Sequence, residues 1–361
     1  MSLLFEPLDL RGIQVRNRAW VSPMCQYSAV DGMPGDWHLV HLGARALGGA
    51  GLVMTEATAV SPEGRISPYD TGIWDDAQAE RWARIAAFLR EHGATAAVQL
   101  AHSGRKASSR RPWDEQQGVV PPSEGGWQPV GPSAVAFDGL AVPTPLDDAG
   151  LAQVQADFVA AARRSVEAGF QVVEVHAAHG YLLHSFLSPL ANRRTDGYGG
   201  DLAGRSRLLR EVVDDVRAAV DVPLLVRISA TDWAEGGWDV EQSVELARDL
   251  AGRGVDLVDV SSGGAVAHQA ITVGPGYQVP FAAAVRAAGV PTAAVGLITE
   301  PRQAEQVLAD GHADAVLLAR ESLRDPNWPL RAAAALGDDV TWPVQYQRAR
   351  PRVAAGAAGI R

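Results

Sequence analysis

The chain has 361 residues, 47% hydrophobic and 20% charged, so it can bury the core of one large α/β barrel or of two smaller domains. Its 42 acidic and 32 basic residues give a formal net charge of -10, which argues against nucleic-acid binding, because a phosphate backbone needs a basic surface. The single cysteine, Cys25, excludes an intrachain disulfide and a cysteine-rich zinc or iron–sulfur site. We see neither a signal segment near Met1 nor an apolar run of roughly 20 residues, so we expect a cytoplasmic protein that does not enter a membrane.

Eight short apolar runs recur along the chain, and each is a nearly continuous series of Val, Leu, Ile and Ala. This pattern is typical of parallel strands that are covered on both faces. The predicted strands are residues 19–24, 51–58, 95–101, 170–177, 222–229, 255–261, 291–297 and 313–319. The stretches between them predict helices at residues 38–47, 75–92, 147–168, 204–220, 240–253, 280–288 and 301–310. Four of these helices are followed by a glycine, as is common at helix C-termini: Gly93, Gly169, Gly254 and Gly311.

Alternating strands and helices fit either a closed barrel or an open doubly wound sheet. Polar residues stand at or near the C-terminal ends of five strands: Cys25, Gln99, His176, Arg227 and Ser261. In a barrel these ends meet at one mouth, where active sites form. An open dinucleotide-binding sheet should also carry a Gly-rich turn after its first strand, and G-x-G-x-x-G does not occur in this chain. The sequence therefore predicts one α/β domain over residues 1–361, a (β/α)8 TIM barrel.

Three segments fall outside the repeating pattern. Residues 10–16, around Gly12, predict a small N-terminal hairpin that closes the floor of the barrel. Residues 103–146 are rich in Pro, Gly and Trp and too long for an ordinary loop, so we interpret this insertion after strand three as a lid over the catalytic face. Residues 340–361 form a C-terminal tail that follows the last helix.

The first polar cluster is His176-Ala-Ala-His179-Gly-Tyr181, directly after the fourth strand. Two histidines three residues apart can share a helical face as metal ligands, but no third ligand is evident nearby, and we predict no metal. They can also cap the strand end, or donate hydrogen bonds to an anionic or carbonyl oxygen at the barrel mouth. Tyr181 beside them is a candidate general acid.

The second cluster is Ser22-Pro23-Met24-Cys25-Gln26-Tyr27, after the first strand. A lone cysteine is more often a small buried hydrophobe than a reactive group. A nucleophilic Cys25 would need a partner base, which the local sequence does not reveal. Both interpretations stay open at this stage.

Two further sets of residues suit a flavin. Gly296 follows strand seven, and Ala319-Arg320 ends strand eight, where barrels often bind a phosphate. Arg320 taken by itself is equally a surface ion-pair partner. Gln99 and Arg227 end strands three and five, and a buried arginine needs anionic or carbonyl partners. A phosphate site beside a site for a polar ring suggests FMN.

These residues together resemble the Old Yellow Enzyme family, in its bacterial thermophilic-like branch of ene-reductases and xenobiotic reductases. The resemblance covers nearly the whole chain and is carried by motifs in a fixed order: NR at 17–18, SPMCQY at 22–27, HLVHL at 38–42, QLAHSGRK at 99–106, HAAHGYLLHSFLSP at 176–189, NRRTDGYGG at 192–200, VG at 295–296 and PVQY at 343–346.

The resemblance implies a role for each matching residue. The residues expected to line the flavin ring are Pro23, Met24, Cys25, Ala57, Gln99, His176 and Arg227. Those expected to hold its phosphate are Gly296, Ala319 and Arg320. Four residues are expected to act on the substrate: His176 and His179 bind its oxygen, Tyr181 donates the proton and Tyr27 forms a hydrogen bond to it. Cys25 is expected to tune the flavin, and Lys106 to lie near the flavin edge. Gln26 and Ala319 depart from the family pattern, where Met and Gly are more usual.

The resemblance also implies an activity: NADPH or NADH reduces FMN, which then reduces activated carbon–carbon double bonds in enones, maleimides and nitro compounds. It implies a homodimer or homotetramer in which Arg348 of the tail enters the neighbouring subunit's site. A related reductase type with an iron–sulfur cluster is ruled out by the single cysteine. Two rivals are a flavin-free barrel lyase or aldolase, for which no strand-end Lys or metal site is present, and a non-catalytic flavin sensor, against which the His176, His179 and Tyr181 set argues.

Overall fold

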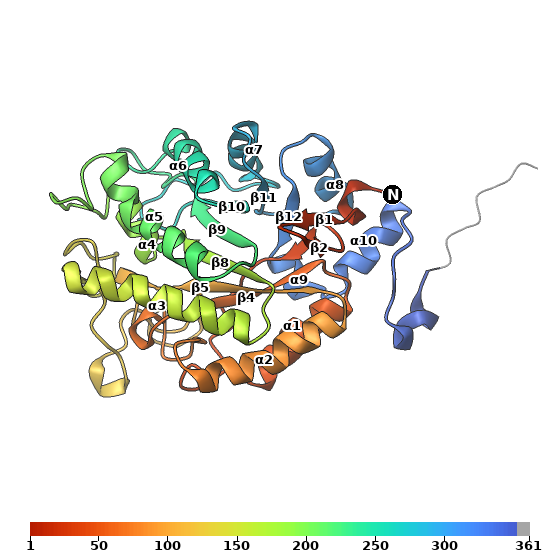
Figure 1. Cartoon of the computed structure of the whole chain (residues 1–361), viewed down its shortest axis with the longest axis horizontal. Helices are drawn as coiled ribbons and strands as arrows, with labels where there is room; N and C mark the ends of the chain where they lie inside the picture. The colour runs from red at the N-terminus through yellow and green to blue at the C-terminus, as the bar shows by residue number, and fades with distance from the viewer. Residues whose placement is uncertain (352–361) are drawn as a thin grey trace, which may run out of the picture.

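The computed structural model describes residues 1–351, and its centre is a closed barrel of eight parallel strands surrounded by helices (Figure 1). The barrel strands are β3 (Ala19–Val21), β4 (Leu52–Ala59), β5 (Thr95–Ala101), β8 (Val172–Ala177), β9 (Leu224–Ser229), β10 (Leu257–Ser261), β11 (Thr292–Ala294) and β12 (Ala315–Leu318). The last strand closes on the first, since Val316 pairs with Ala19 and Leu318 with Val21. The predicted (β/α)8 barrel is thus confirmed, and each strand is buried along its whole length, as the continuous apolar runs indicated.

The helices follow the strands in the expected alternation. They are α1 (Asp36–Leu47), α2 (Asp76–Glu91), α3 (Asp148–Glu167), α4 (Leu182–Leu187), α5 (Leu202–Ala219), α6 (Val240–Gly252), α7 (Val279–Ala287), α8 (Pro301–Ala309), α9 (Arg320–Arg324) and α10 (Trp328–Leu336). The seven predicted helices do not include α4, α9 or α10. The six residues of α4 are all buried and therefore show no amphipathic period. Side-chain caps fix several helix starts; Asp75, Asp147, Asp201 and Asp239 each accept a hydrogen bond from a backbone N–H in the first turn of the helix that follows.

The predicted N-terminal hairpin is present. It consists of β1 (Leu8–Leu10) and β2 (Ile13–Val15), antiparallel strands joined through Arg11 and Gly12, both with positive φ. A short 3-10 turn, η1 (Leu3–Phe5), precedes it. Leu10 and Val15 pack with residues near the N-terminal ends of the barrel strands, so the hairpin closes the floor of the barrel as expected.

The insertion after β5 lies on the side of the barrel where the strands end. It contains two short 3-10 turns and two strands of two residues each: η3 (Gly104–Lys106), η4 (Pro122–Glu124), β6 (Val130–Gly131) and β7 (Thr144–Pro145). Buried Arg105 anchors it by donating to the carbonyl oxygens of Val135 and Ala136 within the insertion and of Ala265 after β10. Two smaller elements lie elsewhere, η2 (Pro62–Gly64) after β4 and η5 (Val344–Ala349) in the tail.

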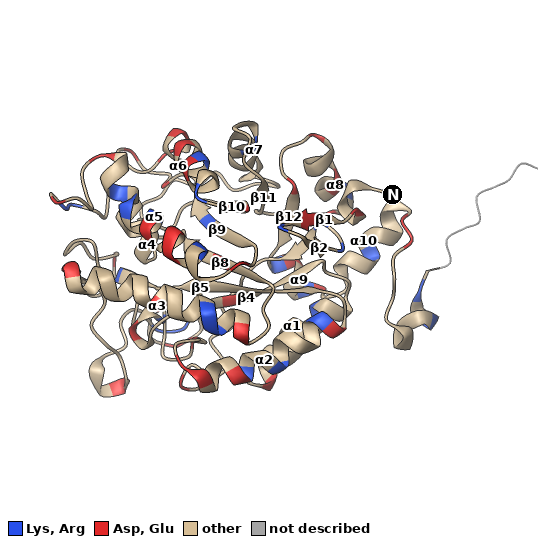
Figure 2. Ribbon diagram, in the orientation of Figure 1, with Lys and Arg blue, Asp and Glu red and all other residues tan. Residues whose placement is uncertain are grey.

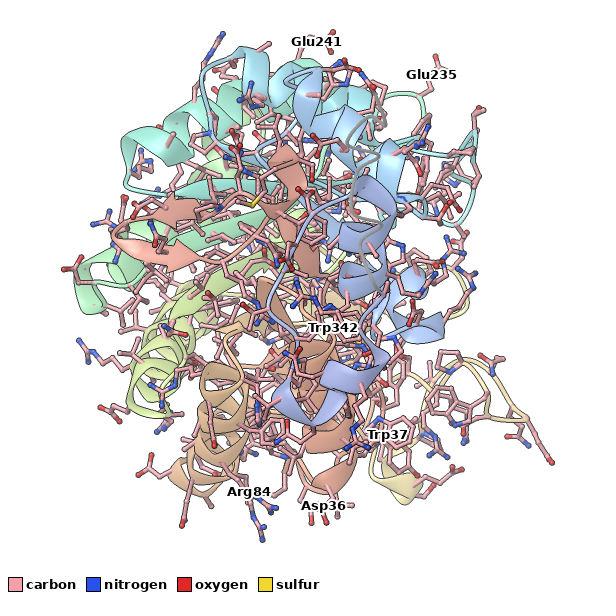
Figure 3. All side chains as sticks on the ribbon, turned by 90° about the vertical axis from the view of Figure 1, so that its right-hand side faces the viewer. Asp36, Trp37, Arg84, Glu235, Glu241 and Trp342 are labelled. Carbon is pink, nitrogen blue, oxygen red and sulfur yellow. The ribbon has the colours of Figure 1, made fainter. Side chains whose placement is uncertain are left out.

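Charged residues of both signs are interspersed over the outer helices (Figure 2). Figure 3 labels Asp36 and Arg84, whose side chains lie 3.6 Å apart and join the start of α1 to α2. Across residues 1–351, each helix is too short or too polar to pass through a bilayer.

Candidate active site at the barrel mouth

The structure brings the three candidate residues of the fourth strand together. The ring of His176, in β8, lies with its centroid 5.2 Å from that of His179 and 5.1 Å from that of Tyr181, edge to face in both cases. Tyr181 also packs with Cys25 and Tyr27 against the small apolar residues Ala57, Ile66 and Ala101. The loops after the first and fourth barrel strands therefore meet over one mouth, as predicted from strand-end positions.

His176 is held as a neutral imidazole with one defined tautomer. Its Nδ1 accepts a hydrogen bond from the Ala178 N–H at 3.2 Å, so the ring proton must sit on Nε2. Burial lowers the pKa of His176 well below its usual value, and the Arg227 guanidinium lowers it further. The ring is therefore a neutral group with an N–H at Nε2 that is available as a hydrogen-bond donor.

His179 adopts a backbone conformation with φ of 59°, which is uncommon for a residue other than glycine. Its N–H donates to Ser229 Oγ at 2.9 Å, and its Nε2 lies 2.8 Å from Ser261 Oγ. Burial lowers the pKa of His179 well below the usual value, with a further contribution from Arg227. Strained conformations of this kind persist only where surrounding contacts enforce them, and they cluster at functional sites.

Lys106 braces the loop that carries His179. Its ammonium donates to the carbonyl oxygens of His179 at 2.9 Å and Gly264 at 3.2 Å, and lies 5.3 Å from the Tyr181 ring centroid. Burial lowers the Lys106 pKa to about 8. The loops after β8 and β10 touch backbone to backbone here, because a Cβ on Gly180 would lie 2.1 Å from the Gly264 oxygen. Lys106 thus holds two rim loops to the insertion.

Both tyrosines at the mouth keep their protons. Burial raises the pKa of Tyr181 well above its usual value, and burial together with Cys25 raises that of Tyr27 strongly. Tyr27 has a φ of 48°, and its ring meets the edge of Trp113 from the insertion at 5.6 Å. Tyr181 is accordingly a neutral phenol suited to donate a proton, and Trp113 forms the outer wall beside Tyr27.

Cys25 is a neutral thiol. Burial raises its pKa well above the usual value, and the nearby carboxylates of Asp70 and Glu56 raise it further. A nucleophilic cysteine needs the opposite surroundings, with a base or a positive charge that favours the thiolate. The raised pKa therefore favours the interpretation of Cys25 as a packing or tuning residue over that of a nucleophile.

Glu56 is a residue of this site that the sequence patterns did not single out. It occupies a register shift in β4, between Met54 and Ala57, and such bulges redirect side chains next to active sites. Its carboxylate accepts from the Gln26 N–H at 2.9 Å and lies 3.1 Å from Nε2 of buried His38. Glu56 therefore fixes the loop of Cys25 and Tyr27 to α1. The sequence did carry a signal for Glu56, because a carboxylate inside an apolar strand needs a buried partner.

Below the mouth, the barrel interior holds a layer of polar side chains that pair between neighbouring strands. Gln99 donates to Glu174 at 2.7 Å, and Arg227 Nε lies 3.2 Å from Asp259. Burial raises the Glu174 pKa to about 8, with Asp259 adding to the shift. Arg227 also reaches Ser22 Oγ at 3.3 Å, next to Pro23. The predicted pair of Gln99 and Arg227 thus faces the same space as His176.

The predicted phosphate residues line one cavity of about 150 Å³, between the loops after β11 and β12. Gly296, Ala319 and Arg320 all contribute to it, and so do Arg324 and Glu321, which pair with each other at 3.1 Å. Gly296 has a φ of 121°, and a Cβ there would lie 2.8 Å from Gln278, so only glycine fits. Ala319 has a φ of -100°, which does not require glycine. Arg320 forms no ion pair among the described residues, so its guanidinium is left to bind a phosphate, as FMN would require.

Arg348 lies apart from these residues within its own chain. It belongs to η5, in which each residue is exposed, and among the described residues its side chain forms no ion pair. Any role in an active site would have to come through another subunit.

Comparison with known proteins places this geometry in a family. Residues 3–339 match the model of the NADH:flavin oxidoreductase / NADH oxidase family. The chain belongs to this family. It is 47% identical over 352 residues to an NADPH dehydrogenase of Geobacillus thermodenitrificans (strain NG80-2), which covers 96% of this chain and 98% of that protein. The predicted membership of the Old Yellow Enzyme group and of the oxidoreductases acting with NAD(P)H is thereby confirmed.

Solved structures agree with this family assignment. A 2-naphthoyl-CoA reductase in complex with 2-naphthoyl-CoA superposes with a TM-score of 0.83 at 25% identity, over 93% of this chain. This chain spans about half of that protein, 52% of its length. Morphinone reductase superposes with a TM-score of 0.78 at 30% identity, over 95% of this chain and 91% of that one. The barrel therefore carries the architecture of a flavin oxidoreductase over nearly its whole length.

The family motif at residues 192–200 has a structural task near the site. Asn192 Nδ2 donates to the carbonyl oxygens of Phe186 and Tyr198, and Arg194 reaches the carbonyls of Pro132 and Leu146 in the insertion. The loop thereby ties the insertion to α4, directly behind the candidate active site.

Another pair missed by the sequence analysis supports the loop of Tyr181 from below. His184 Nδ1 accepts from the Gly180 N–H at 2.8 Å, and its Nε2 lies 3.1 Å from Asp232, with both side chains fully buried. Asp232 also accepts from Ser188 at 2.6 Å. The LLHSFL segment gave no signal for this contact, because Asp232 stands far along the chain.

Proposed function

We propose that the protein is an FMN-dependent ene-reductase that uses NADPH or NADH to reduce activated carbon–carbon double bonds in enones, maleimides and nitro compounds. The observation that carries the proposal is the convergence of two neutral imidazoles and a neutral phenol, with His176 5.1 Å from Tyr181 and 5.2 Å from His179. Two hydrogen-bond donors and a proton donor are what the reduction of an enone requires beside a hydride source.

FMN would be held by residues in or directly after seven of the barrel strands. Its phosphate would occupy the cavity of Gly296, Ala319 and Arg320. Its ring would lie against Pro23, Met24, Cys25, Ala57, Gln99, His176 and Arg227, which surround the barrel mouth. The bound flavin supplies the hydride that the reaction needs.

The protein's own residues then act on the substrate. His176 and His179 donate hydrogen bonds to its carbonyl or nitro oxygen and so polarise the double bond, as oxyanion-hole donors do. Tyr181 delivers a proton to the α-carbon, and because burial raises its pKa, the phenol carries that proton before the reaction. Tyr27 and Trp113 form the wall that positions the substrate. Lys106 contributes by holding the His179 loop.

The proposal is tested with purified enzyme in anaerobic stopped-flow experiments. We expect a yellow protein that releases FMN on heating, whose flavin is bleached by NADPH or NADH and recoloured by 2-cyclohexenone. A colourless protein that takes up no FMN would refute the proposal. Flavin that NADPH reduces but only oxygen reoxidises would indicate the sensor function instead.

We further propose a homodimer, or a tetramer of dimers, in which Arg348 completes the neighbouring subunit's pocket. Val344 in the tail is 77% exposed and Val40 on α1 is 69% exposed, which leaves apolar surface for a partner to cover. Trp342, in the tail, and Trp37, on α1, are seen from the same side of the molecule in Figure 3. Both surfaces are therefore available to one neighbour.

Mixed subunits test the role of Arg348. Tyr181→Phe subunits combined with Arg348→Ala subunits should give more 2-cyclohexenone reduction than either variant alone. In a mixed dimer, one active site carries both substitutions and the other carries neither. A monomer in sedimentation experiments, or an Arg348→Ala enzyme with wild-type kinetics, would contradict this arrangement.

A further inference from the structure

Ser261 ends β10 and is the one side chain that shares a hydrogen bond with the ring of His179 among the described residues 1–351. Its Oγ lies 2.8 Å from His179 Nε2, across a sequence separation of 82 residues. The side chain is 4% exposed, so water competes little for this contact. A neutral imidazole holds one ring hydrogen, so the direction of this hydrogen bond and the tautomer of His179 are fixed together.

The hydroxyl of Ser261 has two acceptors within reach. One is His179 Nε2 at 2.8 Å, and the other is Gln278 Oε1 at 3.3 Å. The amide of Gln278 has a defined orientation, since its Nε2 donates to the Val295 carbonyl at 3.0 Å. Its Oε1 therefore faces the serines, and it already accepts from Ser262 at 2.6 Å. The shorter and unshared acceptor for Ser261 is the imidazole.

We propose that Ser261 donates its hydroxyl hydrogen to His179 Nε2 and thereby keeps the imidazole proton on Nδ1, the nitrogen that is left to face the substrate oxygen. This assignment rests on the proposed function, because that oxygen belongs to the substrate. Ser261 is a positioning residue: it sets the tautomer of His179 and does not itself touch the reacting atoms.

The two histidines then use opposite tautomers. His176 accepts at Nδ1 from a backbone N–H and donates from Nε2, whereas His179 accepts at Nε2 from Ser261 and donates from Nδ1. Opposite tautomers allow two residues only three positions apart to direct one N–H each toward the same oxygen. Without the serine hydroxyl, the His179 proton moves to Nε2, and a lone pair faces the oxygen in place of a donor.

The test uses ¹⁵N-histidine-labelled FMN enzyme and ¹⁵N NMR of the ring nitrogens, with His179 assigned by comparison with His179→Gln. In the wild-type protein, Nδ1 of His179 should be protonated and Nε2 should not. In Ser261→Ala the proton should appear on Nε2. Ser262→Ala is the matched control, because its hydroxyl meets the same Gln278 but not His179, and Ser261→Thr should restore the wild-type pattern by restoring the hydroxyl.

Binding of 4-hydroxybenzaldehyde gives a second measurement, followed by the charge-transfer band of phenolate with oxidised flavin. Loss of one donor should weaken binding about 5- to 30-fold in Ser261→Ala, with recovery in Ser261→Thr. Ser262→Ala should change it by less than about twofold, as for a substitution away from the ligand.

The outcomes separate this inference from the proposed function. A wild-type His179 protonated on Nε2, or one that stays protonated on Nδ1 in Ser261→Ala, would overturn the inference, and the wild-type spectrum decides even if the variant fails to fold. If the tautomer changes as stated but the wild-type enzyme reduces no enone, the proposed function fails and the role of Ser261 in setting the tautomer stands.

Discussion

The two ends of the barrel are built by the same strands but have opposite chemistry. Near the floor, the inward-facing side chains form a dry apolar cluster with the hairpin. Two residues further along several of the strands, the inward side chains become polar and buried. The four clearest pairs are Ala97 and Gln99, Val172 and Glu174, Leu225 and Arg227, and Leu257 and Asp259.

The comparison shows how one sheet separates stability from chemistry. Side chains on a strand alternate between the two faces, so a step of two residues keeps the same face and rises one layer. Apolar burial at the floor stabilises the folded protein. The polar layer above it contributes less to folding stability, because buried polar groups cost free energy unless they are paired. Gln99 is paired with Glu174, and Arg227 with Asp259. Substitutions at the floor should affect stability, and those at the mouth should affect catalysis.

The sharpest effect is expected at the mouth. Tyr181→Phe should slow reoxidation of the reduced enzyme by 2-cyclohexenone by about 10²–10⁴-fold, the usual contribution of a general acid. Reduction by NADPH should be nearly unchanged, because the proton is needed only when the alkene is reduced. Single-turnover stopped-flow measures the two halves separately. Tyr198→Phe, which loses a hydroxyl bonded to Glu211, is the control; equal slowing of both halves in Tyr181→Phe would indicate structural damage instead.

A substitution at the floor tests the other end of the barrel by removing apolar packing. Trp20 is fully buried there, and its Nε1–H donates to the Asn17 carbonyl at 2.9 Å. Trp20→Ala should lower the free energy of unfolding by about 3–5 kcal/mol, with enone turnover preserved at a temperature where the protein is folded. Urea unfolding at one FMN concentration measures the loss. Leu323→Ala, at a residue 45% exposed, should cost far less, and equal losses would contradict the contrast.

Acid should destabilise the folded protein mainly through residues at the mouth, where buried neutral histidines are concentrated. Burial lowers the His102 pKa from 6.5 to about 4. Between these values the unfolded chain holds a proton that the folded chain lacks, so stability falls as the pH decreases from 6.5 towards 4. His102→Gln should remove up to about 1.4 kcal/mol per pH unit from this slope. Urea unfolding at several pH values tests this, and an unchanged slope would show that His102 is protonated in the folded protein.

The smallest effect is expected at Cys25. Because its thiol is neutral, it can influence the flavin only weakly, and Cys25→Ala should shift the midpoint potential by about 30 mV or less while FMN stays bound. Potentiometric titration with a reference dye measures the shift. No shift would leave Cys25 as a packing residue.

Much of this protein could be predicted from its sequence, because the relevant signals are local. The continuous apolar runs indicate buried parallel strands, and the polar residues at their ends indicate which end of the barrel carries the site. The predicted clusters of His176, His179 and Tyr181 and of Cys25 and Tyr27 do meet at the mouth. Chain order is sufficient here, since closure of the barrel brings all strand ends to one rim.

What only the tertiary structure decided are contacts between residues far apart in the chain. The bulge that turns Glu56 toward Gln26 and His38 is a shift in strand register, which composition does not reveal. The contact of Ser261 with His179 depends on how the loops after β8 and β10 approach each other through Gly180 and Gly264. Such contacts fix protonation states and side-chain directions, because a hydrogen bond depends on tenths of an ångström, whereas the sequence pattern specifies only which face and which end of a strand a residue occupies.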